Sequence, residues 1–307
     1  MEYLIRVETG FGRRHYIKYR YAVIQLLECS QPRIEPIHYE RTLMAERAKV
    51  IITDFITDPL DEEQNILGDL ADVAALQVEH EDELVGKIED ADAIMLYHFI
   101  SLSEKTIERL TNCKLIVRCG AGYDNVDHQF ARSKGIPVAN VPDYGTEEVA
   151  DSAIGLALSL ARGSHFLNSR LQRGKEPWSY SQAGSIKRLR GLTFGIIGFG
   201  RIGKAAGLRA KALGMRVVYY DPYVPDGTDK SLGVERQESL KELLSQSHIV
   251  SCHCFLNEET HHIIDAAAIA RMPEGSFLVN TARGGVVHAE AVVDAIETGH
   301  LAGAGID

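Results

Sequence analysis

The sequence has 307 residues, a net charge of −10 and 25% charged side chains. This length allows two domains, each with its own core, and the acidic balance disfavours nucleic-acid binding as the main activity. No apolar run is long enough to cross a membrane and the N-terminus has no signal-peptide pattern, so we expect a cytoplasmic protein without a membrane partner. The five cysteines, an odd number, indicate a reducing compartment.

The first segment, residues 1–46, is net basic, rich in arginine and tyrosine, and without a clear hydrophobic period. It is either a basic arm that binds an acidic partner or a dispensable extension. We predict that the ordered protein begins near Met44, whose sequence MAERAKVIITD runs directly into the first strand.

From Lys49 onward, short apolar runs alternate with helix-like segments. Strands are predicted at 50–53, 75–78, 93–97, 115–118 and 138–140, and helices at 62–70, 81–88, 104–110 and 128–133. This alternation with short connections indicates a parallel sheet covered by helices on both faces. Right-handed crossovers make it an open, doubly wound layer. We assign residues 47–150 to this first domain.

A long helical stretch opens at Thr146, which is predicted to cap the helix, with Glu147 and Glu148 favourable in the first turn. Its apolar run from Ala153 to Ala161 suggests burial against another domain or subunit. We therefore place the domain boundary here and expect a homodimer contact on this helix. Trp178, the only tryptophan, follows in a loop and is explained by core or interface packing.

The most informative stretch runs from Leu192 to Asp221. An apolar strand at 194–197 is followed by Gly198, Gly200 and Gly203, by a helix at 201–213 and by a second strand at 217–220. In this G-x-G-x-x-G frame the first glycine allows a tight turn, the second lets the backbone approach a pyrophosphate, and the third lets the helix pack closely on the strand. Phosphate oxygens then reach the free N–H groups of the helix. The frame alone also marks flexible loops, and a nucleotide-free βαβ unit is the alternative, but the order of elements favours nucleotide binding.

Asp221 ends the second strand, eighteen residues after Gly203. A carboxylate at about this spacing accepts hydrogen bonds from the ribose hydroxyls of the adenosine. It would also repel a 2′-phosphate, so we expect NAD rather than NADP as the cofactor.

The alternation of strands and helices then continues, with strands predicted at 248–254, 276–281 and 302–307 and helices at 240–245, 266–271 and 289–298. These elements form a second domain, residues 151–307, which holds the nucleotide site. Cys252, His253 and Cys254 invite interpretation as a metal site. On a strand, however, the two cysteines would share one face and His253 would take the other, and zinc pairs are usually spaced more widely. We therefore predict no metal.

Two strand ends carry candidate substrate groups, because ligands of open parallel sheets lie beyond the carboxyl ends of strands. Arg283 stands between Ala282 and two glycines, where its planar fork suits a small carboxylate; an ordinary surface arginine is the alternative. In the first domain, the backbone N–H groups of residues 120–122 can hold a carboxylate. His98 could line the same cleft, although a single histidine is more often structural.

The chain from about Lys49 to Asp307 resembles the D-isomer-specific 2-hydroxyacid dehydrogenases, and within them the branch that contains the C-terminal-binding proteins. The segments that carry the resemblance are LYHFISLSEKTIERL, RCGAGYDNVD, VPDYGTEEVAD, GIIGFGRIG, YYDPYVPDG, HCFLNEETHHII and FLVNTARGG. The resemblance implies an α/β fold of two doubly wound, Rossmann-like domains, and NAD-dependent hydride transfer at C2 of a D-2-hydroxy acid.

The resemblance also implies roles for individual residues. Arg283 would be the catalytic arginine that holds the substrate carboxylate. The dinucleotide contacts would be Gly198, Gly200, Arg201, Ile202, Gly203, Asp221, Cys254, Asn257, Thr281, Ala282 and Asp307, and the substrate contacts would be His98, Gly120, Ala121 and Gly122. The nicotinamide is expected to face Arg283 across a gap between the two lobes.

The sequence departs from the family pattern at its end. The family's general acid/base histidine and its partner glutamate follow the strand-ending aspartate, whereas this chain stops at Asp307. We therefore expect the second domain to be incomplete and turnover to be lower by about 10²- to 10⁴-fold. His288 and His300 do not match the motif and receive no role.

Two functions stay open on the sequence. The first is an NAD-dependent oxidoreductase that acts on the CH–OH group of a D-2-hydroxy acid or reduces the 2-oxo acid. The second, implied by the branch that the chain resembles, is an NAD-responsive, corepressor-like interaction protein with little or no turnover.

Overall fold

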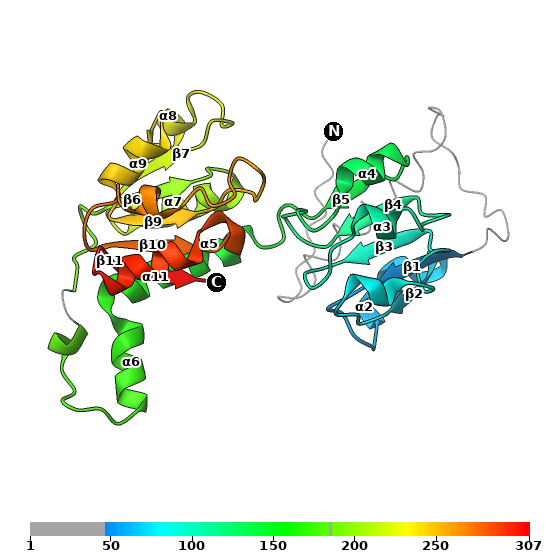
Figure 1. The fold of residues 1–307 in the computed structure, drawn as a ribbon, viewed down its shortest axis with the longest axis horizontal. Helices are drawn as coiled ribbons and strands as arrows, with labels where there is room; N and C mark the ends of the chain where they lie inside the picture. Colours follow the sequence, from blue (N-terminus) through cyan, green and yellow to red (C-terminus); the bar gives the residue numbers. More distant parts are fainter. Residues whose placement is uncertain (1–46, 184–185) are drawn as a thin grey trace. The chain divides into compact units, whose positions relative to one another are not determined.

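The structure is a computed structural model that describes residues 47–183 and 186–307. The predictions for residues 1–46 lie outside these residues. The chain divides into two compact units between Tyr144 and Gly145, and the boundary predicted at residue 150 falls inside the helix that follows. Each unit is built on its own parallel sheet with helices packed on it (Figure 1), which confirms the predicted α/β class.

The first unit holds, in its described residues, a five-stranded sheet ordered β2-β1-β3-β4-β5. The strands are β1 (Ala48–Ile52), β2 (Ala71–Ala75), β3 (Ala93–Leu96), β4 (Leu115–Arg118) and β5 (Val138–Asn140). The helices are α2 (Asp61–Leu67), α3 (Glu104–Ile107) and α4 (His128–Ser133), with the 3-10 turns η1 (Gly68–Leu70) and η2 (Glu81–Leu84). The chain leaves β1 towards one edge of the sheet and β3 towards the other. The topological switch point, where such sheets bind ligands, therefore lies at the carboxyl ends of β1 and β3.

The helix predicted at 104–110 ends at Ile107, and two elements of this unit differ more from their predictions. The strand expected at 75–78 is β2, which begins at Ala71 and alternates buried and exposed residues because it lies at the sheet edge. An apolar run was therefore the wrong signal for it. The helix expected at 81–88 is the single turn η2, in which the Glu83 carboxylate accepts a hydrogen bond from the backbone N–H of His80. The turn ends at Val85, whose backbone is extended, and Gly86 follows with a left-handed φ of 78°.

The second unit holds, in its described part, a six-stranded sheet ordered β11-β10-β9-β6-β7-β8. The strands are β6 (Thr193–Ile197), β7 (Arg216–Tyr220), β8 (Glu235–Arg236), β9 (Ile249–Cys252), β10 (Ser276–Asn280) and β11 (Leu301–Ile306). The helices are α5 (Thr146–Arg162), α6 (Ser164–Gln172), α7 (Arg201–Ala212), α8 (Thr228–Leu232), α9 (Leu240–Gln246), α10 (Ala266–Ile269) and α11 (Ala289–Glu297), with the turns η3 (Tyr180–Ala183) and η4 (Gly284–Val286). The switch point of this sheet lies between β6 and β9.

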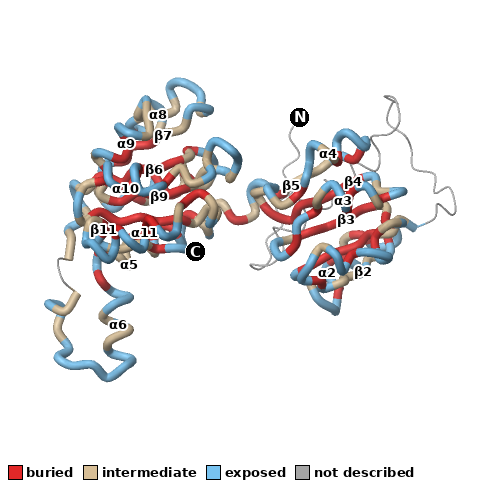
Figure 2. Tube along the Cα trace, in the orientation of Figure 1, coloured by how far each residue is buried: buried red, intermediate tan, exposed pale blue. Residues whose placement is uncertain are grey.

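The central strands β6, β9 and β10 are buried along their whole length (Figure 2). Two apolar clusters account for this burial. One includes Val250 and Leu278 with α9 to α11, and the other includes Ile196 and Val279 with α5 and α7. Strands covered on both faces are expected of a doubly wound sheet.

The N-terminus of α5 corrects one prediction. Its N-cap is Gly145 and no side chain caps it, so Thr146 is an ordinary residue of the first turn. The helix ends at Gly163, whose left-handed backbone (φ 63°) redirects the chain into α6. Glycine adopts this conformation more readily than any other residue, and the predicted long helix is two helices.

The apolar face of α5 corrects a second prediction. Ala153, Ala157 and Ala161 pack into the core of their own unit, so this face is not left for a second subunit. Helix α5 comes close to β11 because two residues of that strand, Gly303 and Gly305, are glycines. A Cβ added at Gly305 would lie 3.0 Å from the Cβ of Leu156.

The segment from α6 to η3 projects from the sheet of the second unit (Figure 1). Helix α6 has no buried residue, and the side chain of Trp178 is 77% exposed. Trp178 is therefore not a core residue, and core packing as an explanation for it was wrong. Among the described residues, no helix combines the length and the hydrophobicity that a membrane span needs.

Candidate functional site

Three glycines shape the loop between β6 and α7. Gly198 has a φ of 87°, and a Cβ there would lie 2.6 Å from the backbone nitrogen of Cys254. A Cβ at Gly203 would lie 2.2 Å from the carbonyl oxygen of Gly198, so α7 could not pack as it does. Gly200 is exposed and has no atom within 4 Å of its Cβ position. The loop thus combines a tight turn, an open approach and close helix packing, which suit a pyrophosphate at the N-terminus of α7.

A cavity of about 190 Å³ opens where β6, β7 and β9 end. Five predicted cofactor residues line it, namely Gly198, Gly200, Asp221, Cys254 and Asn257. The prediction missed other lining residues, namely Ile197, Tyr220, Pro222, Tyr223, His253, Phe255, Glu259, Thr260 and Ile263. Seven of these nine lie in the loops that follow β7 and β9, so the rule that ligands lie at strand ends was a usable signal for them.

The Asp221 carboxylate holds the glycine loop and also faces the cavity. Its Oδ2 accepts a hydrogen bond of 2.7 Å from the backbone N–H of Phe199, and its Oδ1 accepts one of 2.9 Å from that of Tyr223. Each carboxylate oxygen has a further lone pair for a ligand hydroxyl. The side chain therefore joins β7 to the glycine loop and brings a negative charge to the cavity.

Tyr223 and Glu259 tie together two of the loops that line the cavity. The Tyr223 hydroxyl donates a hydrogen bond of 2.6 Å to Glu259 Oε2, and this carboxylate raises the pKa of Tyr223. Tyr223 follows β7 and Glu259 follows β9. Each loop carries one exposed aromatic side chain, Tyr223 in the first and Phe255 in the second. These side chains offer flat apolar surfaces for a base.

Burial sets the charge of two further lining residues. It lowers the pKa of His253 to about 4 and raises the pKa of Cys254 to about 11, so both side chains are neutral at pH 7. A protonated thiol is a poor metal ligand. Over the residues that the structure describes, no group of three or more His, Cys, Asp and Glu side chains is arranged to hold a metal ion.

The turn after β10 carries Thr281, Ala282 and Arg283, outside the cavity lining. Asn280 fixes it: its side-chain amide donates to the carbonyl of Arg283 (2.8 Å), and its oxygen accepts from the N–H of Ala282 (3.0 Å). Thr281 Oγ1 is buried and has no hydrogen-bond partner within the described chain, which is unusual for a buried hydroxyl. Asp307 is exposed, and its backbone N–H donates to Asn280 (3.0 Å).

Arg201 and Ile202, also predicted as cofactor contacts, form the first turn of α7. Arg201 is exposed and Ile202 half-buried. The glycine cradle, the free helix N-terminus, the acid-lined cavity and the orphaned Thr281 hydroxyl together fit a dinucleotide.

The predicted substrate residues of the first unit lie together at the carboxyl end of its sheet. Arg118 is buried, and its Nη2 lies 3.1 Å from Nδ1 of His98. Gly120 makes room for this guanidinium, because a Cβ there would lie 1.4 Å from Arg118 Nη1. The carbonyl of Ala121 accepts a hydrogen bond of 2.7 Å from the Asn140 side chain, and Gly122 follows it half-buried.

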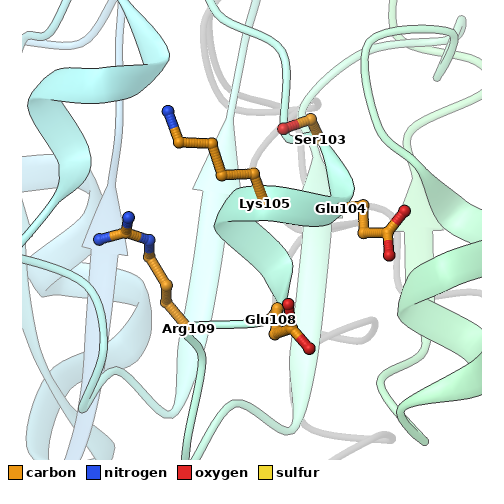
Figure 3. A pocket seen from close by; sticks show the side chains of 5 residues that line it. All are labelled: Ser103, Glu104, Lys105, Glu108 and Arg109. Atoms are coloured by element: carbon orange, nitrogen blue, oxygen red, sulfur yellow. The ribbon is translucent and has the colours of Figure 1, made fainter.

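A second hollow lies against α3 and is lined by Ser103, Glu104, Lys105, Glu108 and Arg109 (Figure 3). The two carboxylates point to one side of the helix and the two cations to the other. Lys105 pairs with Asp82 at 2.6 Å. These five side chains do not converge on a common point, so the hollow is not a candidate site.

The doubly wound sheet, the glycine loop and the acid-lined cavity define the second unit as a dinucleotide-binding domain of the Rossmann class. Residues 154–307 match the family model described as D-isomer specific 2-hydroxyacid dehydrogenase, NAD binding domain. The chain belongs to this family, and its cofactor is NAD.

Individual relatives agree with this assignment. The chain is 36% identical over 251 residues to C-terminal-binding protein 1 of Caenorhabditis elegans, which covers 80% of this chain and 34% of that protein. It is 36% identical over 253 residues to D-3-phosphoglycerate dehydrogenase of Methanocaldococcus jannaschii, with 82% and 48% covered. The structure of D-lactate dehydrogenase from Aquifex aeolicus, complexed with NAD and lactic acid, is similar with a TM-score of 0.76 and 30% identity, over 84% of this chain and 76% of that one. The chain spans less than half the length of these two curated relatives.

Proposed function

We propose that the protein is an NAD-dependent oxidoreductase that interconverts a D-2-hydroxy acid and the corresponding 2-oxo acid. The observation that carries this proposal is the cavity at the switch point of the second sheet, with open Gly200 on one side and the Asp221 carboxylate on another. Membership of the dehydrogenase family supports the reaction class.

The residues of this chain have separate tasks in the proposal. Gly198, Gly200 and Gly203 admit the pyrophosphate, and Asp221 accepts a ribose hydroxyl and repels a 2′-phosphate. When bound, NAD would accept the hydride that leaves C2 of the hydroxy acid, and NADH would return it to C2 of the 2-oxo acid. Arg283 binds the acid's carboxylate through its planar fork, on a turn that Asn280 holds in place.

Three groups of residues complete the proposed contacts. Arg201, Ile202, Cys254, Asn257, Thr281, Ala282 and Asp307 would contact the dinucleotide, and the Thr281 hydroxyl would gain its missing hydrogen bond there. His98, Gly120, Ala121 and Gly122 would contact the acid. The cluster of His98, Arg118 and Gly120 at one end of the first sheet supports the second set.

The test combines cofactor binding with turnover. Calorimetry on the full-length protein should show NADH binding at least about tenfold more tightly than NADPH, because Asp221 faces the cavity. Asp221→Asn should reduce this preference about tenfold, while Asp226→Asn, which changes an exposed aspartate paired with Arg236, should not. When 2-oxo acids from a panel are then added, at least one of them should oxidise NADH, which is measured as a fall in absorbance at 340 nm. The absence of any heat of NADH binding to the folded protein would contradict the proposal.

A second function is favoured by the similarity to C-terminal-binding protein 1. In this alternative the protein binds NAD and responds by recruiting a partner, with little turnover. NADH binding without oxidation by any 2-oxo acid, together with NADH-dependent self-association or peptide capture, would select it.

We also propose that the protein is a cytoplasmic homodimer. The four cysteines in the described residues, Cys113, Cys119, Cys252 and Cys254, are all free thiols, which supports a reducing compartment. Exposed apolar side chains gather on the projecting segment after α5, which supports self-association.

A further inference from the structure

Four rings gather at the switch point of the first sheet, where β1 and β3 end. The Phe55 ring stacks on Tyr97 at a centroid distance of 5.5 Å, meets His98 edge-on at 5.5 Å and lies 5.9 Å from Phe99. We call these four residues the switch-point rings. Phe55 follows β1, and the other three follow β3. Their position corresponds to that of the NAD cavity in the second sheet, between the two strands from which the chain departs in opposite directions.

A buried carboxylate holds three of these residues in place. Asp54 accepts hydrogen bonds from the backbone N–H groups of Tyr97 (2.8 Å), His98 (2.8 Å) and Phe99 (2.7 Å), and from the Thr53 hydroxyl (2.8 Å). Asp54 itself is 0% exposed. Three successive N–H groups on one carboxylate make a rigid segment, so the rings are displayed on a fixed backbone rather than on a loose loop.

The position of the Phe55 ring requires a strained backbone. Phe55 has a φ of 70°, a conformation that is a true outlier for a bulky side chain. Its side chain is 54% exposed, and that of Phe99 is 64% exposed. The strained backbone and the exposed rings do not stabilise the unit, because these rings are not packed in its core. Such combinations cluster at binding sites, where a ligand covers the surface.

A cationic group adjoins the rings. His98, which contacts Phe55, also lies 3.1 Å from the guanidinium of Arg118 through its Nδ1. The loop from Gly120 to Gly122 begins two residues after Arg118, and the backbone N–H of Gly120 donates a hydrogen bond of 2.8 Å to the carbonyl of Arg118. An apolar surface beside a positive one matches an organic acid with an apolar tail, whereas glyoxylate and pyruvate have little or no side chain to cover the rings.

We propose that Phe55, Tyr97 and Phe99 form the subsite for the side chain at C3 of the substrate, and that the protein favours 2-oxo acids with an aromatic side chain. This inference rests on the proposed dehydrogenase function and adds the substrate class to it. The flat ring of such a side chain packs face-to-edge or offset on Phe55 and Phe99.

The test compares phenylpyruvate with pyruvate as substrates of the full-length protein. The wild-type kcat/KM should be at least about tenfold higher for phenylpyruvate, and Phe55→Ala should reduce this ratio about tenfold, through KM. Phe99→Ala should act in the same direction. Both side chains are exposed, so neither variant removes core packing. Leu70→Ala is the matched control: Leu70 is 52% exposed and precedes the amino end of β2, at the other end of the sheet.

A binding measurement separates this inference from the proposed function. Calorimetry in the presence of NAD should show phenylpyruvate binding more tightly than pyruvate, with the difference lost in Phe55→Ala and kept in Leu70→Ala. That result upholds the subsite even if no acid oxidises NADH, in which case the proposed function alone fails. Equal use and binding of the two acids by the wild-type protein would overturn the inference. So would a Phe55→Ala variant that alters self-association but not the ratio, because the rings would then cover a second copy.

Discussion

His253 shows how burial fixes the charge of one side chain beside the cofactor cavity. Burial lowers the pKa of His253 to about 4, and its Nε2 lies 2.9 Å from the Ser251 hydroxyl. In the unfolded chain the same ring titrates near pH 6.5. Between these values the unfolded state binds a proton that the folded state does not, so its stabilising contribution is complete above pH 6.5 and falls as the pH drops towards 4.

We therefore predict that His253→Gln lowers the pH dependence of stability. Between pH 7.5 and 5.0 the wild-type free energy of unfolding should fall by about 2 kcal/mol more than that of the variant. Urea unfolding of both proteins at the two pH values measures this difference. His261→Gln, a change at an exposed histidine of the following segment, is the control and should follow the wild type. Equal pH dependence in wild type and His253→Gln would mean that the ring takes up its proton over the same pH range in the folded protein as in the unfolded chain.

The glycine loop makes a prediction at the scale of an element, because its glycines serve different purposes. Gly203→Ala should destabilise the second unit by about 2 kcal/mol or more, since its Cβ would press on the Gly198 carbonyl and force α7 away from β6. Gly200→Ala meets no neighbouring atom, so its melting temperature should match the wild type while its affinity for NADH falls at least about tenfold.

Thermal melts and NADH titrations of the two glycine variants separate the roles. The contrast itself is the control, because both changes add one methyl group to the same loop. An unstable Gly200→Ala variant, or one that binds NADH normally, would contradict the assignment of Gly200 to the phosphate approach.

The same loop shows which elements could be predicted from the sequence. Strand β6, the glycines and helix α7 follow one another within twenty residues, so local periodicity and glycine spacing were sufficient to place them. Strand β2 was misplaced because it lies at an edge and lacks an apolar run. The apolar face of α5 was visible in the sequence, but its neighbours β10 and β11 come more than a hundred residues later. Periodicity reveals that a face is buried and not what buries it.

The cavity shows the same limit for a site. Gly198 and Asp221 were predicted because the spacing between them is fixed by one βαβ unit. The bond between Tyr223 and Glu259 joins two loops whose proximity depends on β7 and β9 both flanking β6. The switch-point rings depend likewise on β1 lying next to β3. Strand order is a property of the assembled sheet, and no local pattern in either loop encodes it.

At the scale of the whole molecule, each unit repeats one design. Each sheet starts from a central strand, grows to one edge and then returns to build the other. The crevice left at the reversal holds the acid-lined cavity in one unit and the switch-point rings in the other. The two candidate sites therefore follow from the topology, and the side chains placed there decide that one suits a nucleotide and the other an apolar acid.

The segment from α6 to η3 belongs to neither crevice, and its side chains bear on the oligomeric state. Phe166, Leu171, Trp178 and Tyr180 are 41%, 56%, 77% and 79% exposed. A projecting segment with this much apolar surface lowers its free energy when a partner covers it. Aromatic side chains of this kind are the residues that dominate interface energies. Since α5 is already packed in its own core, this segment is the better candidate for the dimer contact.

We predict that the wild-type protein sediments as a dimer at micromolar concentration and that Leu171→Ala with Tyr180→Ala raises the dimer dissociation constant at least about a hundredfold. Trp178, the only tryptophan, reports the same event, because its emission should shift to the red as the protein is diluted and the ring meets water. Leu208→Ala on α7, at a side chain 45% exposed, is the control and should leave the dimer intact. A wild-type monomer whose emission is independent of concentration would show that this segment has another role, since the exposed rings would then stay in water.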